Sequence, residues 1–210
     1  MPERLIFLDI DTQADFMLPQ GALYVPGAEK LLPNLRRLTD FAQRHGILVL
    51  SSADAHSPDD PSFAEWPPHC VTGTGGQRRI PETQLPSPLI IPNRASQLPS
   101  PLPKRGQIIV EKVDYDISSN PNFDAILESL APARFIAFGV ATEFCVCASV
   151  LSLRRRGFAV DLVTDAIQGI NEEGARKAVE EMMVAGVQAV STEEALRRAS
   201  HAMTAAGTEY

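Results

Sequence analysis

Cys145 is the residue whose type and position in this sequence most clearly suggest chemistry. An apolar run ends at Gly139, Thr142 can cap a following helix, and Cys145 falls three residues beyond that cap. In the first turn of a helix, the dipole and the free backbone N–H groups favour a thiolate and can also hold an oxyanion. Most cysteines are only small buried hydrophobic residues, and we interpret Cys70 and Cys147 in that way. Cys145 is therefore the candidate nucleophile.

Asp11 and Lys112 could complete a nucleophilic site around Cys145. Asp11 alone would more often be a turn or cap residue, and Lys112 alone would more often be solvated. However, Lys112 interrupts an apolar segment, and a carboxylate beside a thiol can take its proton and later pass it to a departing amine. Together, the three residues predict a nucleophile, an acid/base and an electrostatic partner.

Asp54, His56 and His69 form a second group. One carboxylate and two imidazoles suit a divalent transition metal with open coordination positions. The D-x-H spacing of Asp54 and His56 is weak evidence by itself, because a lone histidine is more often a surface residue or a satisfied core residue. We interpret His45 and His201 in that way.

The elements that must position these groups alternate along the chain. Short apolar runs predict strands at 5–10, 47–51, 108–111, 135–138, 159–163 and 187–190. Helical spacing predicts helices at 27–45, 121–130, 143–156, 172–185 and 192–200. Nearly continuous apolar strands separated by helices indicate an α/β fold, in which a parallel sheet is covered by helices on both faces.

The candidate residues fall where these strands end. Asp11 follows the first strand, Asp54 and His56 the second, Lys112 the third, and the stretch 139–145 the fourth. In an open parallel sheet, the functional site forms at the carboxyl ends of the strands. The pattern therefore predicts one site at one edge of the sheet.

Length and composition limit the possible classes of protein. The 210 residues suit a single domain over 1–210, with an irregular Pro-rich insertion at about 74–107. The net charge of −7 gives no reason to expect a nucleic-acid or anionic-membrane partner. No apolar run could span a membrane, the start lacks a signal peptide, and the three cysteines are an odd number. We therefore expect a soluble cytoplasmic protein without a disulfide framework.

Five segments resemble the isochorismatase-like cysteine hydrolases, and among them most closely the nicotinamidases. The segments are Asp-Thr-Gln-Ala-Asp-Phe at 11–16, Asp-Ala-His at 54–56, Trp-Pro-Pro-His-Cys at 66–70, Lys-Val-Asp-Tyr at 112–115 and Gly-Val-Ala-Thr-Glu-Phe-Cys-Val at 139–146. The first and last of these matches are specific, and the resemblance runs from about residue 5 to residue 195 in the family's order.

The resemblance implies a doubly wound α/β fold with a six-stranded parallel sheet. It also implies a Cys145–Asp11–Lys112 triad, and a cis peptide between Val140 and Ala141 that aims the Ala141 N–H into an oxyanion hole beside that of Cys145. A divalent metal ion (Zn, Fe or Mn) would bind the pyridine nitrogen of a small amide substrate. The matching positions are Asp54, His56 and His69 for the metal, and Phe16, Trp66, Tyr115 and Val140 for the substrate pocket. Family members are often homo-oligomers, which we expect here too.

Several departures from the family pattern lie around the pocket. Ala55 stands where tryptophan is usual, Val113 where glycine is common, and 73–80 lacks the usual acidic-aromatic continuation. Some members place a further histidine ligand near Asp60. The departures leave the triad alone and bear on the substrate, so hydrolysis of another small amide or of a carbamoyl compound is the alternative to nicotinamide hydrolysis.

Two further alternatives come from other classes of protein. The segment 7–12 resembles the aspartate motif of haloacid dehalogenase-type phosphatases, but Gln13 stands where that motif needs Thr or Val. A non-catalytic binding protein on the same fold would usually have lost the nucleophile, whereas this chain keeps Cys145.

Overall fold

The computed structural model describes residues 3–207, and a single parallel sheet runs through them. The sheet has seven strands in this part of the chain, in the order β3-β4-β2-β1-β5-β6-β7, and every neighbouring pair is parallel. The strands are β1 (Arg4–Ile10), β2 (Leu48–Asp54), β3 (Leu89–Ile91), β4 (Gly106–Lys112), β5 (Ala133–Val140), β6 (Ala159–Gln168) and β7 (Gln188–Val190). The α/β fold with a parallel sheet is therefore confirmed.

The prediction of six strands is wrong by one edge strand. β3 pairs with β4 from Leu89↔Ile108 to Ile91↔Val110 and lies inside the Pro-rich stretch 74–107. Three residues between Pro88 and Pro92 are too few to show a strand period, so no pattern in the sequence revealed it. The single-domain prediction covers 1–210, of which residues 1, 2 and 208–210 lie outside the described residues.

Helices cover both faces of the sheet because successive strand residues point to opposite sides. From β1, Ile6, Leu8 and Ile10 pack with α3 (Phe123–Leu130), α4 (Cys147–Arg155) and α5 (Glu172–Val184). Phe7 of the same strand packs on the other face with α2 (Leu32–His45) and α6 (Thr192–Gly207). No helix within residues 3–207 is long and apolar enough to cross a membrane.

The remaining helical elements are short. They are α1 (Ala14–Met17), the 3₁₀ turns η1 (Ala28–Leu31), η2 (Pro61–Ala64) and η3 (Ile117–Ser119), and the π-helical turn η4 (Thr142–Val146). The helix predicted at 143–156 therefore begins as η4 and continues as α4. Thr142 does not cap it, because the cap position is Ala141 and the Thr142 hydroxyl has no hydrogen-bond partner among the described residues.

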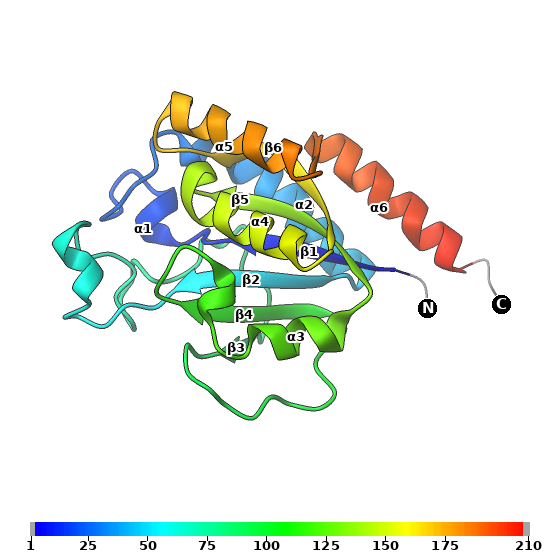
Figure 1. Ribbon diagram of the computed structural model, residues 1–210, viewed down its shortest axis with the longest axis horizontal. Coiled ribbons are helices and arrows are strands. Elements are labelled where there is room, and N and C mark those ends of the chain that lie inside the picture. Colours follow the sequence, from blue (N-terminus) through cyan, green and yellow to red (C-terminus); the bar gives the residue numbers. More distant parts are fainter. Residues whose placement is uncertain (1–2, 208–210) are drawn as a thin grey trace.

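The carboxyl ends of the central strands lie together on one side of the molecule (Figure 1). α1 and the segment that carries η2 lie on that side, and the two chain ends lie on the opposite side. Gly139, near the end of β5, has a φ of +123°, and a Cβ there would collide with the carbonyl of Ile10. Glycine is therefore required where β5 passes the end of β1.

Candidate active site

The carboxyl ends of β1, β4 and β5 bring Asp11, Lys112 and Cys145 together. Asp11 directly follows β1, Lys112 is the last residue of β4, and Cys145 lies in η4 immediately after β5. Lys112 Nζ lies 2.8 Å from Asp11 Oδ2 and donates to Cys145 Sγ across 3.6 Å. Lys112 also makes a short contact with Asp54, the last residue of β2. The predicted meeting of these side chains at the carboxyl edge is present in the fold.

Burial and charge set the protonation of this cluster. The pKa of Lys112 is well above its ordinary value because Asp11 and Asp54 outweigh the burial that would lower it. Burial raises the pKa of Asp11, and it raises the pKa of Cys145 well above its ordinary value although Lys112 opposes this. The first-turn position therefore does not by itself make Cys145 a thiolate, and the thiol needs a base beside it. Asp11, with its raised pKa, is a stronger base than an exposed carboxylate.

Side-chain hydrogen bonds hold the Asp11 carboxylate and the backbone of Asp54 in place. Ser52 Oγ donates to Asp11 Oδ1 at 2.6 Å. The side-chain amide of Gln13 brackets the backbone of Asp54, since Nε2 donates to the Asp54 carbonyl at 2.9 Å and Oε1 accepts from its N–H at 2.7 Å. Ser52 and Gln13 were not singled out in the sequence, although Gln13 stands inside the specific segment 11–16.

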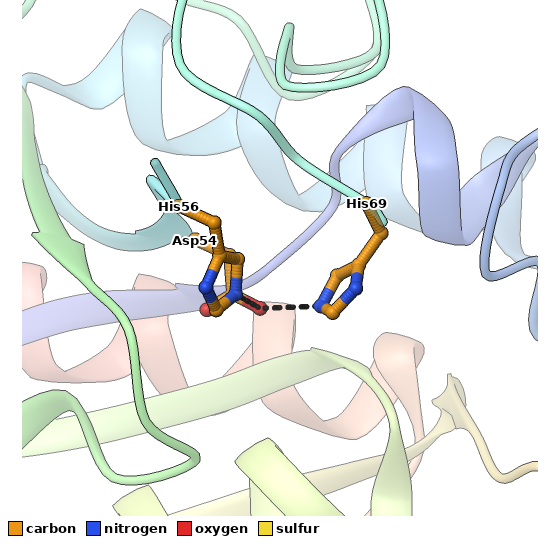
Figure 2. Close-up of side chains that lie close together, drawn as sticks. All are labelled: Asp54, His56 and His69. Carbon is orange, nitrogen blue, oxygen red and sulfur yellow. Dashed lines mark ion pairs between the residues drawn. The ribbon is translucent and has the colours of Figure 1, made fainter. Parts of the chain in front are cut away.

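Asp54, His56 and His69 also converge. Asp54 Oδ2 lies 3.6 Å from His56 Nε2 and 3.7 Å from His69 Nε2, and one ligand atom from each residue lies within 4.8 Å of the others. Figure 2 shows both rings turning a nitrogen toward the Asp54 carboxylate. All three side chains are buried, and Lys112 together with both histidines holds the pKa of Asp54 below its ordinary value despite burial.

The donor set fits a divalent metal ion. His69 Nδ1 lies 2.8 Å from the Pro67 carbonyl, so that nitrogen carries the proton and Nε2 is left with a lone pair that faces the group. His56 Nδ1 lies 3.0 Å from Asp60 Oδ2, and this contact places His56 Nε2 on the side of Asp54. Asp60 thus contacts the outer nitrogen of His56 and is not one of the three converging ligands.

A largely apolar pocket opens onto Cys145. Phe16, Trp66, Tyr115 and Val140, the four residues predicted for the substrate pocket, all line it together with Ala141. The peptide bond between Val140 and Ala141 is cis, as the resemblance implied. The same pocket is bordered by Asp54 and His69, so the nucleophile and the candidate metal group face one space.

Four pocket residues were missed in the sequence. They are Leu23, Val25, Phe144 and Ile170. Phe144 stands next to Cys145 inside a specific motif and could have been found from it. The other three are ordinary apolar residues on loops, and only the folded chain shows that they line the space beside Cys145.

Known proteins are similar to this chain over most of its length. A family model described as the isochorismatase domain matches residues 5–194. The nicotinamidase of Escherichia coli (strain K12) is 27% identical over 207 residues, covering 89% of this chain and 93% of its own length. The nicotinamidase/pyrazinamidase of Mycobacterium tuberculosis (strain ATCC 25618 / H37Rv) is 27% identical over 203 residues, covering 86% and 95%.

A solved structure is similar over almost the same length. The pyrazinamidase of Pyrococcus horikoshii in complex with zinc superposes with a TM-score of 0.73 at 30% sequence identity, and the match covers 90% of this chain and 99% of that one.

Proposed function

This chain belongs to the isochorismatase family and is an amide hydrolase acting on a C–N bond, and we propose that it converts nicotinamide and water to nicotinate and ammonia through a thioester on Cys145. One observation carries the proposal. Cys145, with Lys112 and Asp11 behind it, opens onto a pocket that Asp54 and His69 also border.

The proposed reaction begins with a proton transfer from Cys145 to Asp11. Lys112, 3.6 Å from the sulfur, stabilises the thiolate that forms. The thiolate then attacks the amide carbon of the substrate. The backbone N–H groups of Ala141 and Cys145 hold the oxyanion of the tetrahedral intermediate. Asp11 then gives its proton to the departing ammonia, which leaves an acyl group on the sulfur.

Water completes the cycle. A water molecule loses a proton to Asp11 and attacks the thioester carbon, so that the C–S bond breaks and the carboxylic acid leaves. The thiolate of Cys145 takes the proton back. The chain returns to its starting state with one amide hydrolysed.

Asp54, His56 and His69 would hold a divalent metal ion beside this pocket. When bound, such an ion supplies a Lewis acid for the ring nitrogen of a pyridine carboxamide. The residues of the chain that orient the ring are then Phe16, Trp66 and Tyr115, whose side chains line the pocket. Aromatic walls suit a flat heteroaromatic ring.

The composition of the pocket favours a ring over a carbamoyl amino acid. Such a substrate would carry its own carboxylate, and no arginine lines the pocket in the described part of the chain.

An ammonia-release assay tests the proposal. Nicotinamide, pyrazinamide and a small carbamoyl amide are each incubated with the wild type and with Cys145→Ala, and metal content is measured on the same samples. We expect turnover of the two ring amides by the wild type alone. Turnover by Cys145→Ala would refute the thioester, and a preference for the carbamoyl amide would refute nicotinamide as the substrate.

A further inference from the structure

A second cavity reaches the candidate metal group from outside the catalytic pocket. Its lining includes Asp54, His56 and His69 together, whereas the catalytic pocket includes only Asp54 and His69 of the three. The second cavity does not touch Cys145. Its volume is about 230 Å³, which leaves room for several water molecules around the three ligands.

Besides Asp54 and His69, two aromatic side chains lie between the cavities. Trp66 and Tyr115 line both, and Trp66 Nε1 donates to the Tyr115 hydroxyl at 3.0 Å. Phe144 packs against each of them on the catalytic side, with ring centroids 5.6 Å and 5.3 Å away. The hydrogen-bonded pair of Trp66 and Tyr115, packed against Phe144, therefore lies between a ring-shaped substrate and the second cavity.

The two cavities differ in the chemistry of their walls. Beyond the metal group, the second cavity is lined by the exposed residues Glu65 and Asp114, and no lysine or arginine lines it within residues 3–207. The catalytic pocket is walled mainly by apolar and aromatic side chains. A hydrated divalent cation is stabilised next to carboxylates and loses solvation against an apolar wall.

We propose that the second cavity is the route by which a divalent metal ion enters and leaves the site of Asp54, His56 and His69. The cation passes Glu65 and Asp114 and reaches the ligands without crossing the catalytic pocket. The ion can then enter or leave while the catalytic pocket is filled. The inference rests on the metal site in the proposed function and does not depend on the identity of the amide.

Matched obstructions of the two cavities test the route. Val113 lines only the second cavity, and Leu23 lines only the catalytic pocket. The Val113→Trp and Leu23→Trp proteins are first stripped of metal. Each is then mixed with Zn²⁺ in a stopped-flow instrument, and a zinc-sensitive dye reports the rate of Zn²⁺ uptake. We expect Val113→Trp to slow Zn²⁺ uptake by about tenfold or more, and Leu23→Trp to change it by less than about twofold.

Charge variants supply a second measurement that does not narrow the cavity. Glu65→Gln with Asp114→Asn should slow uptake by about three- to tenfold at low salt, and added salt should reduce the difference. Glu172→Gln, which removes an exposed carboxylate from a groove beside α5, should leave the rate unchanged.

The outcomes separate the route from the function on which it rests. Equal uptake by both obstructed variants, or slower uptake by Leu23→Trp alone, would overturn the route. If the wild type holds no Zn²⁺ at equilibrium, the metal site and the route both fail, while ammonia release still reports on Cys145. A variant that binds Zn²⁺ with the wild-type stoichiometry has kept its fold at the site.

Discussion

The buried side chains around Cys145 set the pH at which Asp11 can accept its proton. Burial raises the pKa of Asp11 above its ordinary value of 3.8, although Lys112 opposes this. A base acts only when deprotonated, so lowering the pH disables a raised-pKa carboxylate sooner than an exposed one. We expect kcat/KM to fall on the acid side at a pH above 3.8. A pH profile with circular dichroism at each point measures this, and an acid limb at or below the ordinary value would contradict it.

Ser52 offers a direct test of that proton position. Its hydroxyl donates to Asp11 Oδ1 at 2.6 Å and favours the ionised carboxylate. Ser52→Ala should therefore raise the pKa of Asp11 further, move the acid limb to higher pH, and lower kcat by about tenfold. Ser51→Ala is the matched control, because the Ser51 hydroxyl donates to Asp9 at 3.2 Å. A shift of the limb in both variants would show that the effect is not specific to Asp11.

Removal of the metal ion should weaken binding of the substrate ring and leave the reactivity of Cys145 unchanged. If Asp54, His56 and His69 hold an ion that binds the ring nitrogen, chelation should raise KM for nicotinamide by about tenfold or more. Benzamide lacks that nitrogen and is the matched substrate, so its KM should change far less. Steady-state kinetics before and after chelation decide this, and an equal change for both amides would remove the contact.

The turn after β6 depends on one side chain of η4. Glu143 Oε1 accepts hydrogen bonds from the backbone N–H groups of Ile170, at 2.9 Å, and Asn171, at 3.0 Å. Asn171 in turn caps α5 by accepting from the Gly174 N–H at 2.7 Å. Glu143, two residues before Cys145 along the chain, therefore holds Ile170 in the wall of the catalytic pocket.

Glu143→Ala should release this pocket wall. The backbone N–H groups of Ile170 and Asn171 then lose their hydrogen bonds to the Glu143 carboxylate. This loss should lower the unfolding free energy by about 1–3 kcal/mol. KM for nicotinamide should rise more than kcat falls, since the reacting groups do not contact Glu143. Urea unfolding and steady-state kinetics test both effects. Glu143→Gln keeps an acceptor oxygen and should restore most of KM, and failure of that rescue would argue against a positioning role.

At the level of elements, the sequence predicted the central strands and the edge strand β7, but not the other edge strand, β3. β1 and β5 have long apolar runs, and the rule for the carboxyl edge placed Asp11 and Lys112 correctly. β3 lies between Pro88 and Pro92 in a Pro-rich stretch, and the π-helical form of η4 covers only Thr142–Val146, so neither left a signal in the sequence. Ile170 reaches the pocket only through the hydrogen bonds of Glu143, which no local pattern contains.

Across the whole molecule, a buried arginine joins the segment after His69 to the ends of two strands. Arg79 donates to the Ser52 carbonyl at 2.7 Å and to Thr12 Oγ1 at 2.6 Å, and makes a short ion pair with Asp9. The departure from the family pattern at 73–80 is therefore packed against the ends of β1 and β2.

Arg79→Met should destabilise the fold because it leaves Asp9 buried without its cation. We expect a loss of about 3–5 kcal/mol in unfolding free energy. Asp9→Asn combined with Arg79→Met should lose clearly less than the sum of the two single changes. Chemical denaturation of the four proteins tests this, and additive losses would mean that the pair does not act as a unit.

The central claim is that the acyl group passes through Cys145. Intact-protein and peptide mass spectrometry after rapid acid quenching of a reaction with nicotinamide tests it most directly. The account predicts a nicotinoyl adduct on the peptide that contains Cys145, lost when the quench is delayed until the substrate is exhausted and absent from Cys145→Ala. Full ammonia release by Cys145→Ala, or an adduct on any other residue, would contradict it.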